Sequence, residues 1–396
     1  MKIVHVANWY IPNMGYQENF LPAEQIKLGH EVQIVTSDRA PMFDAFQDHV
    51  GRFLDRRVIG SGVFEYDNVT VNRLPCRFEV INGGQVILKG LRRTLRDLKP
   101  DVVHAHGALT PSALLAVWYS KELGYKVFVD DHQDYCNLDI DSAVKKAYVQ
   151  LARLFYRVYG RRVSFWMPTQ YASEQLLQSL FAVPRDKMEV TPLGVDTSCF
   201  AKSEKSRALG RAQMGVRADD TLIVTAGKLN ESKDIDTLIK AFCQVASEAD
   251  NVYLLVLGNG PEAYMRKIRV LANKGNLANK IIFKDFAPHH ELPMYYNAAD
   301  LGVWPGNPSI TVIEAIATGL PVILPQHELA YGILFRNGAA LGFKRGDPSS
   351  LAESALKLLY DSNSKSQITS HALALVEDVL AWNRIAQRSI DIYSTT

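Results

Sequence analysis

Short runs of apolar, often β-branched residues alternate with longer segments of helical period along the whole chain. Such runs predict buried strands, and their alternation with helices predicts parallel sheets covered by helices. One sheet does not comfortably hold all of these runs, so we expect an α/β protein with two sheets. The runs are KIVHVAN, HEVQIVTS, DVVHAHG, KVFVDDH, FWMPTQ, TLIVTAG, VYLLVLGNG, KIIFKDF, ADLGVWP and LPVILP.

The segment between PLGVDTSCF and TLIVTAG is rich in Lys, Ser, Arg, Ala and Gly and has little periodicity. This composition is typical of a boundary between domains. We therefore predict one Rossmann-like domain over residues 1–200 and another over residues 201–377. In open parallel sheets, ligands bind beyond the carboxyl ends of the strands, so the residues that follow each run are the candidates for function.

Composition excludes several other classes of protein. Lysine plus arginine (44) nearly balances aspartate plus glutamate (42), which argues against a dedicated nucleic-acid binder. The four cysteines form no CxxC pair, which argues against a zinc ribbon and a disulfide framework and favours a reducing cytosol. No stretch has the roughly 20 apolar residues of a spanning helix, and the first residues predict a strand rather than a secretory signal. We expect a cytoplasmic protein.

Two lysines, Lys228 and Lys233, follow the strand TLIVTAG, and a helix is predicted to begin near Asp234. Two ammonium groups beside a helix N-terminus favour a diphosphate. For the lysine pair alone, a solvated loop is the competing interpretation.

The segment ADLGVWPGNPSITVIEAIATGLPVILP predicts a strand, a loop, a helix with Ser309 as N-cap, and a second strand. The helix start, Ser309 to Thr311, would offer backbone N–H groups to an anion. Glu314 lies about one turn further, where its carboxylate can accept hydrogen bonds from both hydroxyls of a ribose. A surface or capping role for Glu314 is the alternative.

Taken in order and spacing, these segments resemble the retaining GT-B glycosyltransferases of family 4. The resemblance implies two Rossmann-like domains facing each other across a cleft, and a final helix, about 378–396, that packs on the first domain. It also implies transfer of a sugar, with retention, from a nucleoside diphosphate such as UDP to a glycan or lipid-linked glycan, without a metal or other cofactor. The segments are Lys228 to Lys233, GNGPE, FKDFAP, MYYNAADLGVWP, VIEAIATGLPVI and the linker-like TPLGVDTSCF.

The resemblance also implies roles for single residues. Lys228 and Lys233 would hold the diphosphate and stabilise its departure, Glu314 would hold the ribose, and the base would lie against backbone near Phe286. The full predicted donor-binding set is Gly15, Phe286, Gly306, Asn307, Ser309, Ile310, Thr311 and Glu314.

Departures from the family pattern affect the contacts to the sugar more than those to the nucleotide. Gly306 stands where the family usually has the first of two glutamates, Pro308 and Ser309 stand where Phe-Gly is common, and Lys228 replaces a more frequent arginine. The loss of that carboxylate keeps open a nucleotide-sugar-binding protein with little turnover. A nucleotide-sugar epimerase of related architecture is also open, although it would need carboxylates facing the sugar.

Two short motifs suggest other chemistry. GNGPEA after the strand VYLLVL satisfies the dinucleotide pattern GxGxxG/A, but Asp285 lies beyond the expected spacing of about 20 residues for a ribose-binding acid. Asp139-Ile140-Asp141 spells DxD, and without a histidine at ligand spacing we interpret it as an acidic cluster at a helix N-terminus. We predict no metal site.

The first half contributes two further candidates by resemblance. Gly15, where the family has adjacent glycines, would let backbone approach a phosphate, and a simple turn glycine is the alternative. His132 would donate hydrogen bonds to the reacting sugar or leaving oxygen. His104 and His106 alternate along a strand, and both a cleft role and a strand-end packing role remain open.

Basic and aromatic residues concentrate in residues 143–173 and 89–99, and the first of these ranges has no acidic residue up to Ser173. Basic, aromatic-containing helices suit an anionic membrane surface, where each cation contributes about 1 kcal/mol. A solvated basic face is the alternative. Membrane binding at the cytoplasmic face would suit a lipid-linked acceptor. The cations are Lys89, Arg92, Arg93, Arg96, Lys99, Lys145, Lys146, Arg153, Arg157, Arg161 and Arg162.

Overall fold

The computed structural model describes residues 1–12, 14–40, 57–80, 85–135, 138, 140–275 and 277–396. The chain forms two compact units. The first unit consists of Met1–Leu193 together with Trp382–Thr396, and the second of Gly194–Ala381. The units thus divide after residues 193 and 381, whereas the predicted boundaries lie after residues 200 and 377.

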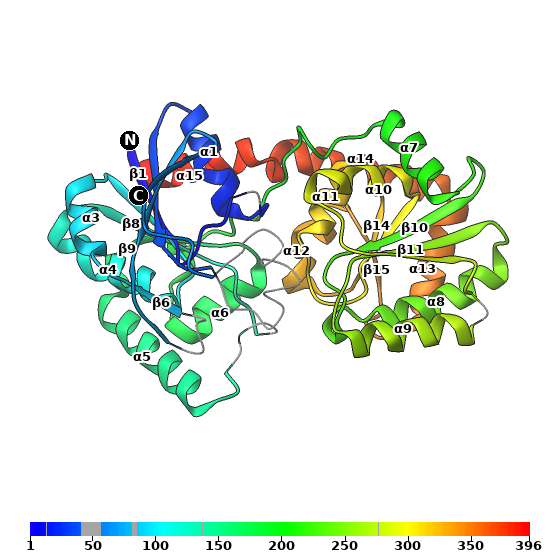
Figure 1. Ribbon diagram of the computed structural model, residues 1–396, viewed down its shortest axis with the longest axis horizontal. Coiled ribbons are helices and arrows are strands. Elements are labelled where there is room, and N and C mark those ends of the chain that lie inside the picture. The colour runs from blue at the N-terminus through cyan, green and yellow to red at the C-terminus, as the bar shows by residue number, and fades with distance from the viewer. Residues whose placement is uncertain (13, 41–56, 81–84, 136–137, 139, 276) are drawn as a thin grey trace. The chain divides into compact units, whose positions relative to one another are not determined.

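The first unit is built on a seven-stranded sheet with the order β3-β4-β2-β1-β7-β8-β9 (Figure 1). All neighbouring strands are parallel except the edge pair β3 and β4, so the carboxyl ends of the six parallel strands share one edge. The strands are β1 (Lys2–Val6), β2 (Glu31–Ser37), β3 (Gly62–Tyr66), β4 (Val69–Leu74), β7 (Val102–His106), β8 (Lys126–Asp131) and β9 (Val163–Pro168).

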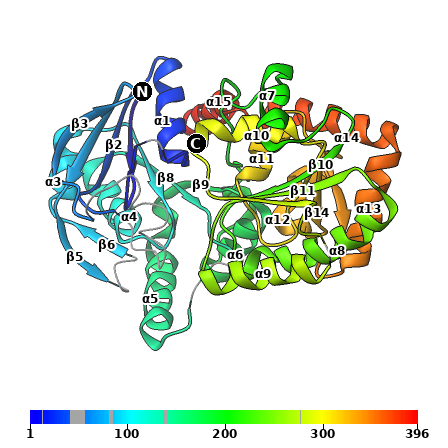
Figure 2. The same cartoon turned by 45° about the vertical axis from the view of Figure 1, so that its right-hand side comes forward.

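Helices cover this sheet, and the last of them comes from the C-terminus of the chain. Helix α15 packs beside α1, where the rings of Phe20 and Trp382 stack with centroids 5.6 Å apart (Figures 1 and 2, red beside blue). A two-stranded antiparallel sheet, β5 with β6, completes the unit. The elements are α1 (Gln17–Lys27), β5 (Cys76–Val80), β6 (Gln85–Leu88), α3 (Leu91–Leu98), α4 (Pro111–Leu123), α5 (Ala143–Tyr159), α6 (Tyr171–Phe181) and α15 (Trp382–Thr395).

The hairpin of β3 and β4 was not predicted from the sequence. Its two-residue turn consists of Asp67 and Asn68, which have φ angles of 49° and 64°. Tight hairpins favour positive φ at both central residues, and Asp and Asn adopt it more readily than most residues do. The dipeptide Asp-Asn between two β-branched runs was therefore the available signal.

The second unit contains a six-stranded, fully parallel sheet with the order β12-β11-β10-β13-β14-β15. Alternating residues of β10 reach two different core clusters, Leu222 and Val224 in one and Ile223 in the other, because helices cover both faces. The strands are β10 (Thr221–Ala226), β11 (Val252–Leu257), β12 (Ile281–Lys284), β13 (Leu301–Val303), β14 (Val322–Pro325) and β15 (Leu341–Phe343).

The helices of the second unit are α7 (Glu204–Met214), α8 (Ile235–Glu248), α9 (Glu262–Lys274), α10 (Leu292–Ala298), α11 (Thr311–Ala317), α12 (Glu328–Arg336), α13 (Pro348–Tyr360) and α14 (Ser362–Leu375). The predicted fold class, α/β with two Rossmann-like domains, is confirmed. Within the described ranges, no helix is both long and apolar enough to cross a bilayer.

Candidate active site

The two predicted phosphate-binding lysines follow strand β10. Gly227, which follows the last residue of the strand, has φ 134°, a short 3-10 helix spans Glu231–Lys233, and α8 begins at Ile235. Burial, together with the positive charge of Lys228, lowers the pKa of Lys233 to about 8. A cation whose charged form is disfavoured in the free protein can gain from an anionic ligand placed next to it.

Lys233 joins this turn to the loop that follows β13. Its Nζ donates hydrogen bonds to the carbonyl oxygens of Asn307 (2.9 Å) and Pro308 (2.7 Å). The backbone N–H of Asn307 donates in return to the carbonyl oxygen of Ser232 at 2.9 Å. An ammonium has three donors, so two carbonyls leave one N–H of Lys233 for a ligand.

Gly306 lies where these two loops touch most closely. A Cβ atom at position 306 would lie 2.3 Å from the carbonyl oxygen of Ser232 and 2.5 Å from Cα of Lys233. Those atoms are backbone, so no side-chain movement can make room for it. The departure of Gly306 from the family pattern therefore coincides with a backbone contact that only glycine permits.

Helix α11 begins one residue later than predicted, and the prediction of Ser309 as its N-cap is wrong. The N-cap is Ile310, which has no side-chain hydrogen bond, while the hydroxyls of Ser309 and Thr311 lie 2.7 Å apart. Thr311 Oγ1 also donates to the carbonyl oxygen of Ala226 (3.1 Å), and Trp304 Nε1 donates to the same oxygen (2.8 Å). These bonds fix the start of α11 against the end of β10.

Backbone N–H groups at the start of α11 remain available to a ligand. Among the described residues, no acceptor pairs with the N–H groups of Ser309, Ile310 and Thr311. Gly227, whose missing Cβ would lie 3.5 Å from Ser309 Oγ, is next to them. Three backbone donors, one spare ammonium N–H and a glycine thus meet at the carboxyl edge of the second sheet.

Glu314 is buried one turn into α11, and only 4% of its surface is exposed. Nε2 of His289 donates a hydrogen bond to its Oε1 at 2.7 Å. Its other oxygen, Oε2, is buried and has no hydrogen-bond partner within the described part of the chain. An unpaired buried carboxylate oxygen is costly, so it marks a position where a ligand hydroxyl would be favourable.

His289 was not predicted as a site residue. It lies in the loop after β12, in a short 3-10 helix His289–Glu291, and its ring packs edge-on against Phe200 with centroids 5.0 Å apart. Phe286, predicted to lie near the base, belongs to the same loop and is 39% exposed. The polar His-His-Glu following a predicted strand was the available signal.

The GNG sequence that suggested a dinucleotide site packs backbone against backbone. A Cβ at Gly258 would lie 1.9 Å from the carbonyl oxygen of Gly227, and one at Gly260 would lie 1.5 Å from that of Leu229. Leu229 N–H also donates to the carbonyl oxygen of Asn259 at 2.9 Å. These two glycines therefore support the lysine-bearing turn.

In the first unit, Gly15 and His132 both follow parallel strands of the sheet. Gly15 has φ 73°, which favours glycine. Nε2 of His132 lies 3.9 Å from Oδ2 of Asp130. Burial alone would lower the pKa of His132, but Asp130 outweighs it and raises that pKa to about 9. His132 is therefore a cation at neutral pH, as suits a hydrogen-bond donor.

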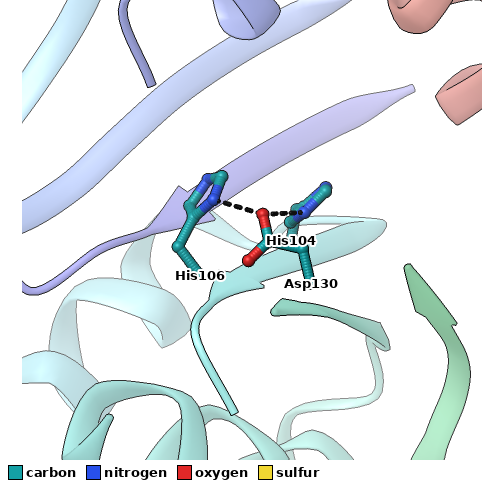
Figure 3. A group of neighbouring side chains, drawn as sticks. All are labelled: His104, His106 and Asp130. Atoms are coloured by element: carbon teal, nitrogen blue, oxygen red, sulfur yellow. Dashed lines mark hydrogen bonds and ion pairs between the residues drawn. The ribbon is translucent and has the colours of Figure 1, made fainter. Parts of the chain in front are cut away.

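His104 and His106 are buried beside Asp130 and bond to it (Figure 3). These residue types occur in metal sites, but His106 Nδ1 lies only 2.6 Å from Asp130 Oδ2. Ligands about 2.0–2.1 Å from a tetrahedral zinc would be more than 3 Å apart. The geometry is that of hydrogen bonds. Asp139 of the DxD motif lies outside the described residues, and Asp141 pairs with Lys145 at 3.0 Å.

Two family models match the chain. The model described as glycosyl transferases group 1 matches residues 206–373, and that of the glycosyl transferase 4-like domain matches residues 21–194. The matches fall in the second and first unit respectively. The chain belongs to the family of GT-B glycosyltransferases that these two models describe.

Curated relatives match with low identity. The chain is 23% identical over 274 residues to alpha-monoglucosyldiacylglycerol synthase of Streptococcus pneumoniae, which covers 66% of this chain and 60% of the synthase. It is 26% identical over 235 residues to D-inositol 3-phosphate glycosyltransferase of Xylanimonas cellulosilytica, which covers 57% of this chain and 55% of that enzyme. The matches thus span little more than half the length of these relatives.

Solved structures show the same fold. Anabaena HepE in complex with UDP has a TM-score of 0.75 at 16% identity, with complete coverage of both chains. A glycosyltransferase from Rickettsia africae has a TM-score of 0.72 at 16% identity, covering 99% of this chain and 97% of the other.

Proposed function

We propose that the protein transfers a sugar from a nucleoside diphosphate, with UDP as the expected nucleotide, to a hydroxyl of a glycan or lipid-linked glycan. The observation that carries this proposal is the polar edge of the second sheet. There the loop of Lys233 is joined to the loop that leads into α11, the N–H groups of Ser309 to Thr311 lie at the start of that helix, and Glu314 lies one turn further along it. Cations and backbone donors suit a diphosphate, and an unpaired carboxylate oxygen suits a ribose hydroxyl.

The names of similar proteins support the same class of donor. HepE was crystallised with UDP and with UDP-glucose, and the Streptococcus pneumoniae relative is a synthase of a glucosylated diacylglycerol. These names describe those proteins, and they make a UDP-sugar and a lipid-linked acceptor the first substrates to test here.

In the proposed reaction, the bond between the sugar C1 and the diphosphate oxygen breaks while C1 bonds to the acceptor oxygen. Negative charge grows on the departing diphosphate, and Lys228, Lys233 and the N–H groups at the start of α11 stabilise it without a metal. The acceptor proton passes to the departing phosphate, and the configuration at C1 is retained. His132, as a cation, donates a hydrogen bond to the sugar or the leaving oxygen.

A nucleotide-sugar-binding protein with little turnover is the second candidate. Gly306 favours it, because the position lacks a carboxylate for the sugar and the backbone of Ser232 and Lys233 occupies the space that a side chain would need. In that case the nucleotide would bind and no sugar would be released.

The experiment is a screen of thermal stability and nucleoside diphosphate release with UDP-, GDP-, ADP- and TDP-glucose. Wild type is compared with Lys233→Ala and Glu314→Gln, and with Lys240→Ala and Glu353→Gln as controls on exposed positions. Stabilisation and slow release with one nucleotide, lost only in the first two variants, supports a transferase. Stabilisation without release supports the binding protein, and no response to any nucleotide rejects the donor site.

We further propose that helix α5 binds an anionic membrane surface at the cytoplasmic face. One face of α5 buries Val149, Ala152 and Tyr156 in the unit. A second apolar stripe is exposed at spacings of seven, three and four residues, which places it on one side of the helix. Its members are Val144 (67%), Leu151 (66%), Leu154 (59%) and Val158 (59%).

Cations flank this stripe and argue for anionic lipid rather than another apolar protein surface. Lys146, Arg153 and Arg157 are exposed on the same helix. The cluster at 89–99 carries less free charge than its sequence suggests, because Arg92 and Arg96 both pair with Glu122. Helix α5 is therefore the proposed contact, and a lipid-linked acceptor would be reached there.

Vesicle sedimentation tests this contact. The full chain should co-sediment with vesicles containing phosphatidylglycerol but not with pure phosphatidylcholine, and Leu151→Asp should abolish co-sedimentation. Leu209→Asp, at a position 51% exposed on α7, is the matched control. Equal behaviour of the two variants, or a concentration-dependent dimer lost in Leu151→Asp, would reject the membrane contact.

A further inference from the structure

Six side chains form a closed ring of hydrogen bonds on the face of the first sheet that α1 and α15 cover. They come from five elements separated in sequence, and none is more than 4% exposed. Three of the rings also stack with centroids 4.7–5.2 Å apart. The members are His5 (β1), Gln25 (α1), His104 and His106 (β7), Asp130 (β8) and Tyr393 (α15).

Asp130 accepts hydrogen bonds from its two neighbours in the ring, His104 and His106. Its Oδ2 accepts from Nε2 of His104 at 3.0 Å and from Nδ1 of His106 at 2.6 Å (Figure 3). Its Oδ1 accepts from the backbone N–H of Gly107 at 3.0 Å. These bonds, with the charge on His106, outweigh burial and hold the pKa of Asp130 well below its usual range. The carboxyl group is therefore ionised.

The other four links run through His5, Gln25 and Tyr393. Nε2 of His106 lies 2.9 Å from Nδ1 of His5, and Nε2 of His5 lies 2.8 Å from Oε1 of Gln25. Nε2 of Gln25 lies 3.4 Å from the hydroxyl of Tyr393. That hydroxyl closes the ring with a bond to Nδ1 of His104.

A count of hydrogens shows what the ring requires. Six links need six hydrogens. A neutral imidazole supplies one, a phenol one, and an amide that donates on one side and accepts on the other supplies one, whereas a carboxylate supplies none. Three histidines, Tyr393 and Gln25 thus supply five hydrogens. One further proton is needed, and it balances the negative charge of Asp130.

Ser389 determines where this proton lies. Its hydroxyl donates to the carbonyl oxygen of Ala386 at 2.7 Å, so its oxygen must accept from Nε2 of Gln25 at 2.8 Å. The amide oxygen of Gln25 therefore faces His5, whose Nε2 must donate to it. When all three imidazoles are neutral, the link that lacks a hydrogen is therefore the one between His5 and His106.

Electrostatics favours His106 as its carrier. Burial lowers the pKa of His5 well below its ordinary value, whereas at His106 the charge of Asp130 outweighs burial and raises the pKa. The charged and titratable groups around the ring are Glu18 on α1, Asp131 at the end of β8, and His132.

We propose that this ring holds one proton on the His5–His106 pair, and that this proton locks the C-terminal helix α15 onto the first unit. Without it, two nitrogen lone pairs face each other 2.9 Å apart. Rotation of the Gln25 amide would relieve the repulsion, but it would turn the amide oxygen toward Ser389 and Tyr393, whose hydrogens are already donated elsewhere. Loss of the proton thus leaves either two facing lone pairs inside the ring or, after rotation, no hydrogen bond from Gln25 to α15.

Histidine ¹⁵N–¹H spectra of the full chain test the count directly. At pH 7.5 we expect one imidazolium in the His5–His106 pair, a neutral His104 with its hydrogen on Nε2, and a neutral His5. Neutral rings at all three positions would overturn the proposal. His290→Gln, which removes a histidine whose side chain is 79% exposed, leaves these signals unchanged and helps to assign them.

Hydrogen exchange measured across pH tests the lock. After correction for intrinsic rates, protection of α15 should fall at the pH where the imidazolium signal disappears. In Ser389→Ala the amide of Gln25 is free to rotate, so this pH should shift downward by about one unit, the equivalent of one hydrogen bond. Ser394→Ala removes a hydroxyl of the same helix that donates to the Ile390 carbonyl and is not a member of the ring, and it should cause no shift. Protection that does not change as the proton is lost would overturn the lock.

Discussion

Nε2 of His289 donates to one carboxylate oxygen of Glu314 at 2.7 Å, while the second oxygen of Glu314 is buried without a partner among the described residues. The histidine thus fixes the carboxylate from one side and leaves the other oxygen for a ligand. A ribose hydroxyl is the proposed occupant, because it can donate the missing hydrogen bond.

This arrangement predicts discrimination between UDP and 2′-deoxy-UDP. Hydrogen bonds to charged groups contribute about 1.5–3 kcal/mol, so wild type should prefer UDP by roughly tenfold or more. Glu314→Gln should reduce that preference, and Glu353→Gln should keep it. Binding of both nucleotides is measured by calorimetry. If wild type binds the two equally, Glu314 does not hold the 2′-hydroxyl.

The lowered pKa of Lys233 predicts how nucleotide affinity depends on pH. Its pKa is lowered to about 8, so the free protein loses this cation as pH rises through that value. Diphosphate binding favours the charged form, and affinity should therefore fall by up to about tenfold per pH unit above pH 8. Titrations between pH 7 and 9.5 measure this. Lys233→Ala should bind weakly at every pH with a flatter profile, and an unchanged slope in that variant would contradict the assignment.

The close backbone contact at Gly306 predicts that any side chain at that position lowers the free energy of unfolding. A Cβ would contact the backbone of Ser232 and Lys233, and overpacking of this kind costs typically 1–3 kcal/mol. Gly306→Ala should lower the free energy of unfolding by about this amount and weaken nucleotide binding, because the loops that carry Lys233 and Asn307 must separate. Gly160→Ala, at a residue with φ −58° where a Cβ would make only an ordinary contact 3.8 Å from Cβ of Tyr156, is a control for the loss of a glycine. A fully stable Gly306→Glu variant with improved turnover would contradict this explanation.

The raised pKa of His132 predicts that turnover decreases at alkaline pH. Because Asp130 raises the pKa of His132 to about 9, its charge is present below that pH and is lost above it. The rate constant at saturating donor should therefore decrease as pH rises through about 9. In His132→Gln the rate should be lower and this decrease absent. His290→Gln should resemble wild type, and a wild-type rate that stays constant to pH 10 would exclude an imidazolium role.

The sequence predicted much of the fold because buried parallel strands read as apolar runs. It placed all ten runs correctly as strands, and it missed β3, β4, β5, β6 and β15. β15 has only three residues, and the β3–β4 pair depends on a turn whose Asp-Asn signal was overlooked. β3 and β15 are edge strands, β4 lies between β3 and β2, and β5 and β6 form a separate hairpin.

For the site, sequence reasoning identified single residues but not their partners. Lys233, Ser309 and Glu314 follow strand ends and were therefore visible. The contact of Gly306 with the backbone of residues 232–233 depends on two loops meeting in space. The bond between His104 and Tyr393 joins residues 289 positions apart, and no local pattern encodes it.

The most direct test is a calorimetric titration of the full chain with UDP at pH 7, using wild type, Lys233→Ala and Lys240→Ala. We predict one saturable site in wild type, an affinity weaker by at least about tenfold in Lys233→Ala, and an unchanged affinity in Lys240→Ala. Equal affinity in all three proteins, or no binding of UDP, GDP, ADP or TDP to wild type, would contradict a nucleotide site at the carboxyl edge of the second sheet.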